Sequence, residues 1–253
     1  MDVVLKIEGL RKHFGSVRAV DGIDLEVREG EFTAVIGPNG AGKTTFFHLV
    51  TGAAAPDEGR VYLAGQDITG WPPASIVRAG LARTFQITSV FPDLTALENV
   101  LLPCLARQNH TARFWPDHAR HPARQTAFAM LKRVGLAGDA DRPCRMMSHA
   151  DQKLVEVAMA LATEPRVLLL DEPAAGLAPG ETDRVIGTLR DVAASEGVTM
   201  VLIEHDMDIV FSMADRVVVL HQGRVLADGP PEDIRRNPTV KEVYLGGTFA
   251  GRG

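Results

Sequence analysis

Hydrophobic and polar positions along the chain follow two periods that change from segment to segment. Segments 3–7 and 23–27 alternate apolar with polar residues, which is the pattern of strands with one solvated face. Segments 32–36, 167–170 and 199–203 are instead continuously apolar, as strands buried on both faces are. Helical spacing of apolar residues occurs between these runs, so the pattern predicts a mixed α/β fold.

The middle of the chain has the pattern of an inserted helical region. Apolar residues recur at helical spacing in 94–105 and 123–134, and a polar stretch at 107–122 separates the two segments. Ser148 and Asp151 then form a variant of the capping box, with Ser148 as the N-cap of a further helix. We therefore expect a helical subdomain inserted into the α/β core.

A glycine-rich stretch lies between the buried strand at 32–36 and a helix that is expected to begin near Phe46. Its glycines let backbone N–H groups turn inward, and the helix N-terminus adds partial positive charge, so the stretch can cradle phosphate. Lys43 can reach the β- and γ-phosphates, and the Thr44 hydroxyl can ligate Mg²⁺. The motif predicts binding of a nucleoside triphosphate. Its residues are Gly37, Pro38, Asn39, Gly40, Ala41, Gly42, Lys43, Thr44 and Thr45.

Polar residues follow two of the buried strands directly. Asp171 and Glu172 end the strand at 167–170, and His205 lies just after the strand at 199–203. Ligands of open parallel sheets lie at the carboxyl ends of the strands, so the acidic pair is expected beside the phosphates.

Phe14 has two interpretations. It lies at the end of a strand beside a glycine, where it could stack on a purine, but residue type alone favours packing in a core or turn.

Composition narrows the class of protein. The chain has 253 residues, 45% of them hydrophobic and 23% charged, which suits one large α/β domain. A formal net charge of −5 argues against a chain that coats nucleic acid. Neither a signal peptide nor a long apolar stretch is recognisable, so we expect a soluble protein whose membrane role, if any, comes through a partner.

Cysteine and histidine residues offer no metal site by their spacing. Cys104 and Cys144 form no CxxC pair and are expected to act as small apolar residues. The histidines in the polar stretch lie among arginines without ligand-like spacing and are expected to be solvated. They are His110, His118 and His121, and a fourth histidine, His149, follows Ser148.

Three stretches together resemble the ATP-binding subunit of an ABC transporter: GPNGAGKTT, LLLDEPAAGLAP and IEHDM. The guanine-reading motif of small GTPases and the arginine-rich lid of nucleoside monophosphate kinases are both missing from the sequence. Within the superfamily, the chain is similar to the ATPase of branched-chain (hydrophobic) amino acid importers and of the related urea importers. Four cues carry this finer likeness: ARTFQ, DEPAAGLAP, IEHDM, and the end of the chain from Asn237-Pro238 to Tyr244-Leu245-Gly246.

The resemblance implies a P-loop NTPase fold of ABC type over residues 1–253, with a mixed sheet, an antiparallel β subdomain and an inserted helical subdomain. A RecA-like core with the antiparallel layer would comprise 1–86 and 164–253. The helical signature subdomain would comprise 87–163, and 230–253 would form a C-terminal helical tail.

The resemblance also implies a role for each matching residue, with ATP and Mg²⁺ as cofactors. Phe14 would stack on adenine, in place of the packing that residue type favours. Gln86, otherwise an ordinary surface amide, would touch Mg²⁺ or the attacking water. Asp171 would hold Mg²⁺ through water, Glu172 would act as the general base, and His205 would contact the γ-phosphate. The expected catalytic residues are Glu172, His205, Gln86 and Lys43, and the expected metal ligands are Thr44, Gln86 and Asp171.

The signature loop departs from the family pattern. Members usually read Leu-Ser-Gly-Gly-Gln or Leu-Ser-Tyr-Gly-Gln, whereas this chain reads Met-Ser-His-Ala-Asp at 147–151. The resemblance implies that Ser148, His149 and Ala150 face ATP bound on the opposite protomer. An Ala150 with φ > 0 would cost roughly 1 kcal/mol, and Asp151 adds negative charge unless it caps the helix. We expect a working but weaker composite site.

The partners implied are membrane permease subunits, a paralogous ATPase or a second copy of the chain, and indirectly an external solute-binding protein. Nucleic acid is not expected as a partner. The location implied is the cytoplasmic face of the inner membrane, as a peripheral subunit. Three alternatives remain open: a urea or other small-solute importer, a soluble ABC ATPase acting on nucleic acid or ribosomes, and a regulator with little hydrolysis.

Overall fold

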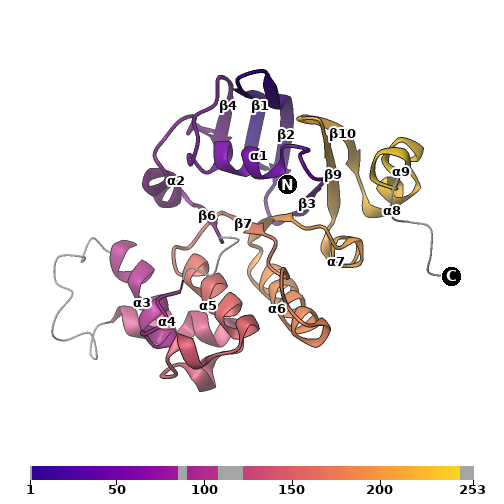
Figure 1. Cartoon of the computed structure of the whole chain (residues 1–253). Coiled ribbons are helices and arrows are strands. Elements are labelled where there is room, and N and C mark those ends of the chain that lie inside the picture. The colour runs from indigo at the N-terminus through magenta and orange to yellow at the C-terminus, as the bar shows by residue number, and fades with distance from the viewer. Residues whose placement is uncertain (1, 85–89, 108–121, 246–253) are drawn as a thin grey trace. The chain divides into compact units, whose positions relative to one another are not determined.

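The computed structural model describes residues 2–84, 90–107 and 122–245, which divide into two units (Figure 1). The first unit contains Met1–Ala79 and Thr199–Gly253, and the second contains residues 80–198.

An antiparallel sheet of four strands forms one layer of the first unit. Its order is β2-β1-β4-β5, and every neighbouring pair is antiparallel. The strands predicted at 3–7 and 23–27 are confirmed, but both are longer than the alternating pattern indicated. The bounds are β1 Val3–Phe14, β2 Val17–Arg28, β4 Glu58–Leu63 and β5 Gln66–Asp67.

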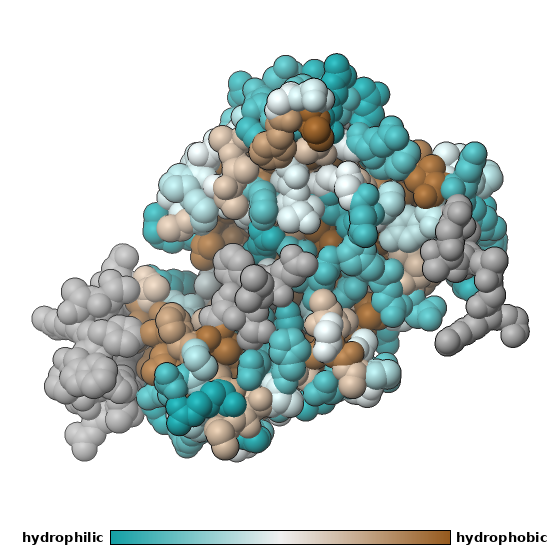
Figure 2. Space-filling view, viewed as in Figure 1, coloured by the Kyte–Doolittle hydropathy of each residue, from teal (hydrophilic) through white to brown (hydrophobic). Residues whose placement is uncertain are grey.

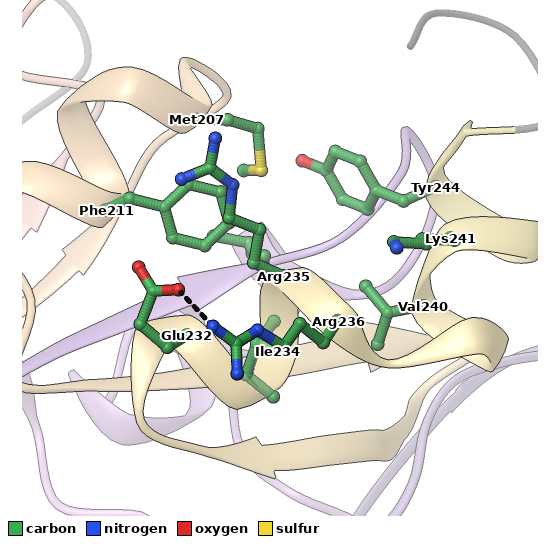
Figure 3. A pocket seen from close by; sticks show the side chains of 10 residues that line it. Met207, Phe211, Glu232, Ile234, Arg235, Arg236, Val240, Lys241 and Tyr244 are labelled. Atoms are coloured by element: carbon green, nitrogen blue, oxygen red, sulfur yellow. Dashed lines mark ion pairs between the residues drawn. The ribbon is translucent and has the colours of Figure 1, made fainter.

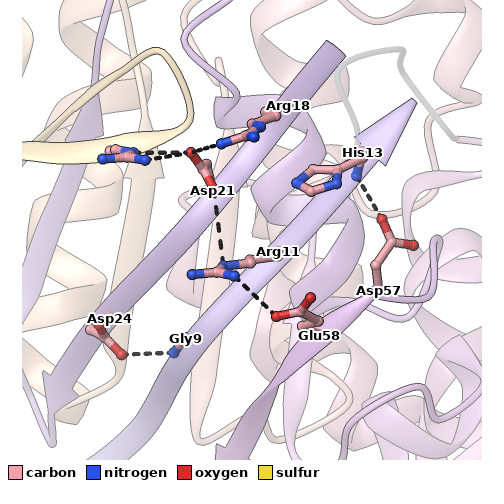
Figure 4. Close-up of polar contacts among 9 residues, drawn as sticks. Gly9, Arg11, His13, Arg18, Asp21, Asp24, Asp57 and Glu58 are labelled. Carbon is pink, nitrogen blue, oxygen red and sulfur yellow. Dashed lines mark hydrogen bonds and ion pairs between the residues drawn. The ribbon is translucent and has the colours of Figure 1, made fainter. Parts of the chain in front are cut away.

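Charged side chains explain the added length of these strands. Beyond Leu10 the side chains of β1 are no longer buried, and ionic contacts replace apolar packing. Arg11 Nη1 lies 3.1 Å from Glu58 Oε2, and Lys12 Nζ lies 2.8 Å from Asp57 Oδ1. Figure 4 shows Arg11, Glu58 and Asp57 in a charged cluster across the strands, and in Figure 2 hydrophilic residues gather over the top of the unit.

Asp21 is the centre of the cluster. Its carboxylate accepts hydrogen bonds of 3.0 and 2.7 Å from Arg224 Nε and Nη2 and lies 3.6 Å from Arg18 and 4.0 Å from Arg11 (Figure 4). The hydrogen bonds from Arg224, with the charges of Arg18 and Arg11, lower the pKa of Asp21 below its ordinary value. The cluster therefore ties residues far apart in sequence to a single carboxylate.

The second layer of the first unit is built around β3. All five residues of β3 are buried, and this strand pairs in parallel with β8 on one side and β9 on the other. Strand β10 returns antiparallel to β9, and the two strands form a hairpin around Gln222-Gly223. The strands are β3 Phe32–Ile36, β8 Thr199–Ile203, β9 Arg216–His221 and β10 Arg224–Gly229.

Five helices of the first unit are described. Helix α1 begins at Lys43, three residues before the predicted start, because Gly42 in the left-handed conformation is its N-cap. The helices are α1 Lys43–Val50, α2 Pro73–Ala79, α7 Met207–Met213, α8 Pro231–Arg236 and α9 Pro238–Leu245.

The second unit combines a parallel strand pair with a group of helices. Strand β6 pairs in parallel with β7, and the helices predicted at 94–105 and 123–134 are confirmed to within two residues at each end. Helices α3, α4 and α5 contact one another, and α5 also contacts α6. The elements are β6 Leu81–Arg83, α3 Ala96–Arg107, α4 Ala123–Arg133, α5 His149–Leu161, β7 Val167–Asp171 and α6 Pro179–Glu196.

The interpretation of the cysteines is confirmed. Cys104 and Cys144 are free and buried, and burial raises the pKa of each thiol to about 11. His110, His118 and His121 lie outside the described residues. Within the described ranges, no cluster of His, Cys, Asp and Glu could hold a metal ion, and no helix is long and apolar enough to span a bilayer.

Asp21→Asn should lower the melting temperature at pH 7, and the loss should shrink as pH falls. The pKa of Asp21 is depressed in the folded chain, so its ionic contacts stabilise the fold above the unfolded pKa of about 4. That stability is lost as pH falls through the folded pKa. Thermal unfolding followed by circular dichroism from pH 7 to pH 3 would measure this. Asp191→Asn, on an exposed face of α6, is the control. A loss for Asp21→Asn that does not change with pH would contradict the assignment.

Candidate nucleotide site

The phosphate-binding stretch is a tight loop between β3 and α1. Glycine is needed in this loop for two reasons, the backbone conformation and the lack of room for a side chain. Gly40 and Gly42 have φ of +79° and +101°, in the left-handed region. A Cβ on Gly42 would lie 2.2 Å from the Ala19 carbonyl oxygen, and one on Gly37 would lie 2.2 Å from the Leu220 carbonyl oxygen. Only glycine lets the loop approach its neighbours this closely.

Lys43 lies inside this loop. Its ammonium group donates hydrogen bonds of 2.6 Å to the Gly37 carbonyl and 3.1 Å to the Pro38 carbonyl, and the residue is 6% exposed. Asn39, Gly40 and Thr44 are exposed around it. The loop thus combines a centred positive charge, a helix N-terminus and an open rim, which suits a phosphate chain.

His205 lies at the same edge of the sheet as the loop. Strands β3 and β8 are parallel neighbours, so their carboxyl ends meet at one edge. His205 is exposed there, and its amide donates a 3.0 Å hydrogen bond to Glu204 Oε2. Asp206 then caps α7 by accepting hydrogen bonds from the amides of Asp208 and Ile209. The first unit therefore brings the predicted lysine and histidine to one edge.

Glu204 and Tyr244 adjoin this edge, and sequence reasoning did not assign them. Glu204 is 4% exposed. Burial raises the pKa of the Tyr244 hydroxyl, the backbone of Gly37 lowers it, and the charge of Glu204 raises it. A carboxylate directly after an all-apolar strand was a usable signal for Glu204. No signal in the sequence linked Tyr244 to Gly37.

Phe14 ends β1 as an exposed ring. The residue is 55% exposed, and Lys12 Nζ lies 5.7 Å from the ring centroid. Of the two kinds of packing that residue type favoured, a core or a turn, the core is therefore wrong for Phe14. An exposed aromatic face is the geometry that stacking on a base would need.

Asp171 is held by an arginine of the neighbouring strand. The Asp171 side chain is 3% exposed, and Arg83 Nη2 donates to its Oδ2 at 2.5 Å. The sequence motif ARTFQ contained Arg83, but its partner became visible only when β6 paired with β7. The pairing neutralises a carboxylate that is withdrawn from water.

Glu172 has a backbone conformation that is unusual for its residue type. Its φ is +49°, in the left-handed region, which costs a non-glycine residue about 1–2 kcal/mol. The amide of Ala175 donates a 3.1 Å hydrogen bond to the Glu172 carbonyl and closes the turn. Strain of this kind occurs at functional sites, where the turn fixes the direction of a side chain.

Ser148 is the N-cap of α5, as predicted. Its Oγ accepts a 3.1 Å hydrogen bond from the Asp151 amide and donates a 2.9 Å hydrogen bond to Asp151 Oδ2. The other carboxylate oxygen of Asp151 accepts from Arg184 of α6. Asp151 therefore does not add an uncompensated charge at the start of the helix.

Ala150 does not have the strained backbone that the family comparison suggested. It lies in the first turn of α5 with right-handed helical geometry and is fully buried. The expected cost of a positive φ is therefore not incurred. Ser148 and His149 remain exposed beside it.

The remaining site residues divide between the two units. Phe14, the phosphate loop and His205 belong to the first unit, and Asp171, Glu172 and the signature residues 148–150 belong to the second. Gln86 lies outside the described residues.

Comparisons with known proteins identify the family. A family model described as ABC transporter matches residues 20–175. The chain belongs to the ABC transporter family. A second model, described as branched-chain amino acid ATP-binding cassette transporter, matches residues 224–250.

Several relatives match along nearly their whole length. The chain is 42% identical over 252 residues to the high-affinity branched-chain amino acid transport ATP-binding protein BraF of Pseudomonas aeruginosa, covering 96% of this chain and 98% of BraF. It is 39% identical over 250 residues to LivG of Escherichia coli, a protein of the same description, with the same coverage.

Solved ABC cassettes have the same fold. The ADP conformation of MJ1267, an ATP-binding cassette, superposes with a TM-score of 0.87 at 34% identity and covers 97% of this chain and all of that one. A dimeric, post-hydrolysis structure of MJ0796 bound to ADP and Pi superposes with a TM-score of 0.75 at 26% identity. The match covers 90% of this chain and 98% of that one. The predicted family, the fold class and the assignment as an ABC ATPase are confirmed.

Arg83→Ala should lower the free energy of unfolding by about 3 kcal/mol, because it removes one partner of a buried ion pair. Urea denaturation would measure the loss. Arg145→Ala is the matched control, since its ion pair with Asp93 is solvent-exposed and should contribute less than about 1 kcal/mol. Equal, small losses for both variants would contradict the structural role of Arg83.

Proposed function

We propose that the chain is the ATP-hydrolysing subunit of a membrane importer for branched-chain amino acids. The observation that carries the solute class is the match of residues 224–250 to the branched-chain transporter model, outside the segment matched by the general ABC model. BraF and LivG, matched end to end, support the same assignment through their descriptions.

An exposed aromatic ring and a phosphate loop match the two ends of ATP. The exposed ring of Phe14 would stack on the adenine base, and the amides of the phosphate loop with Lys43 would hold the phosphates. Mg²⁺ would be held by the Thr44 hydroxyl, Gln86 and, through water, Asp171. Oxygen donors of this kind fit Mg²⁺, and the pairing of Asp171 with Arg83 favours contact through water. The ion, when bound, would neutralise charge on the β- and γ-phosphate oxygens.

Hydrolysis would proceed by in-line attack of water on the γ-phosphorus. Glu172 would accept a proton from the water as the new P–O bond forms, and the bond to the β–γ bridging oxygen would break to release ADP. Lys43 and His205 would stabilise charge on the transferring phosphoryl group. The strained turn at Glu172 would preset the direction of its carboxylate.

Two cassettes would pair head to tail, either two copies of this chain or this chain with a paralogue. The exposed start of α5, Ser148 with His149 and the buried Ala150, would face ATP on the partner. A dimeric structure of the related cassette MJ0796 supports this arrangement. The pair would bind permease subunits at the cytoplasmic face of the membrane, and an external binding protein would supply the solute.

Glu172→Gln should retain ATP binding and reduce turnover at least about 100-fold, because the general base is lost while the phosphate loop is intact. ATP affinity and phosphate release by the purified chain would be measured with Glu29→Gln, an exposed turn residue, as the control. In cells that express the chain with its permease, uptake of labelled leucine should fall in the same variant. Turnover that survives in Glu172→Gln would reject Glu172 as the general base. If Glu172→Gln lost urea uptake but kept normal leucine uptake, branched-chain amino acids would be rejected as the solute.

Arg184→Ala should raise the KM for ATP several-fold, because it leaves the negative charge of Asp151 uncompensated at the helix start that faces the triphosphate. In an Asp151→Gln background the same change should alter KM less than about twofold, since no charge remains to be compensated. Steady-state kinetics of the four proteins form the double-mutant cycle. Equal effects of Arg184→Ala in both backgrounds would refute the compensation.

A further inference from the structure

A cavity of about 460 Å³ lies in the first unit among α7, α8 and α9. Its volume is in the range of small-molecule sites. Figure 3 shows Met207 and Phe211 of α7 on one side, Val240 and Tyr244 of α9 on the other, and α8 below. The walls are mostly apolar and are formed by Ile36, Met207, Phe211, Ile234 and Val240.

Positive charge predominates among the polar residues of the cavity. Arg235, Arg236 and Lys241 line it, against one carboxylate, Glu232. The chain as a whole has a formal net charge of −5, so the net positive charge of the cavity lining is opposite in sign to that of the whole chain. Such a cavity favours an anion over a cation or a neutral ligand of the same shape.

These three cationic side chains form only weak ionic interactions among the residues that the structure describes. Arg236 Nη2 lies 3.7 Å from Glu232, and both side chains are solvent-exposed, so the ion pair is weak. The Arg235 guanidinium lies 5.9 Å from the centre of the Phe211 ring, which holds it over the apolar wall (Figure 3). No ion pair of Lys241 is found among the residues that the structure describes. The cations are thus placed to accept a ligand carboxylate.

We propose that this cavity binds a small carboxylate with an aliphatic body. The carboxylate would lie between Arg235 and Lys241, and the aliphatic body would pack on Met207, Phe211 and Val240. Methionine adapts its shape to irregular apolar groups, so the cavity tolerates branched and unbranched bodies. A neutral isostere would lose the charge-assisted hydrogen bonds and bind more weakly.

The cavity adjoins the nucleotide loop through two of its lining residues. Ile36 directly precedes Gly37 of the loop, and the Tyr244 hydroxyl interacts with the Gly37 backbone. A ligand packed against the Tyr244 ring shifts the Tyr244 hydroxyl, and with it the interaction of that hydroxyl with the Gly37 backbone. Occupation of the cavity therefore changes nucleotide affinity, and by linkage nucleotide changes carboxylate affinity. This coupling rests on the proposed nucleotide site, whereas carboxylate binding does not.

Titration calorimetry on the full chain, without nucleotide, tests the binding step. The probes are 4-methylpentanoate, the neutral 4-methylpentan-1-ol and leucine. The carboxylate should bind at least about tenfold more tightly than the alcohol, the effect of one charge-assisted hydrogen bond. Arg235→Gln and Lys241→Gln should each weaken carboxylate binding, whereas Arg78→Gln, on the exposed side of α2, should not.

Each outcome of this titration decides the proposal. Equal binding of the alcohol and the carboxylate, absence of carboxylate binding, or no effect of the two cavity variants would overturn it. Tighter binding of leucine than of 4-methylpentanoate would support it and would specify an amino acid, with Glu232 accepting the ammonium group.

ADP affinity measured with and without 4-methylpentanoate tests the coupling. The carboxylate should change the Kd for ADP in the wild type, and Tyr244→Phe, which keeps the ring but removes the hydroxyl, should reduce that change. Carboxylate binding with an unchanged ADP affinity would overturn the coupling alone. Failure of the chain to bind ADP at all would reject the nucleotide site and leave the carboxylate result standing.

Discussion

The close approach of backbone to backbone around the phosphate loop is the constraint on which the first unit depends. The Gly223 amide donates a 3.0 Å hydrogen bond to the Ala41 carbonyl, and the Gly223 carbonyl accepts a 2.8 Å bond from the Asp21 amide. Gly37 and Gly42 leave no room for a Cβ against Leu220 and Ala19. The loop is therefore shaped by its neighbours in the fold, and Lys43 is centred in it as a consequence.

Arginine side chains compensate the charge of two carboxylates that are withdrawn from water. Arg83 pairs with the buried Asp171, and Arg184 pairs with the largely buried Asp151. In both cases the arginine comes from a neighbouring strand or helix. A carboxylate of this kind is tolerated because its partner is fixed by secondary structure.

The two unusual features of the second unit differ in their physical meaning. Glu172 has a left-handed backbone that a glycine would adopt without cost, and strain of this kind occurs where a turn fixes the direction of a side chain. Ala150, in place of the family glycine, is accommodated without strain in the first turn of α5. The signature loop therefore differs from the family pattern in its side chains and not in its backbone. Ser148, with its hydroxyl, is still the N-cap of the helix.

The sequence by itself determined the fold class, the phosphate loop, the helical insertion and the family, because each depends on local spacing. The periods of apolar residues select strands or helices, and GPNGAGKTT forms its loop from contiguous residues. Only the tertiary structure decided the partners of Asp171 and Asp151, the exposure of Phe14, the interaction of Tyr244 with the Gly37 backbone and the charged cavity among α7, α8 and α9. These features join residues far apart in the chain, and no local pattern encodes which side chains will meet once strands and helices pack.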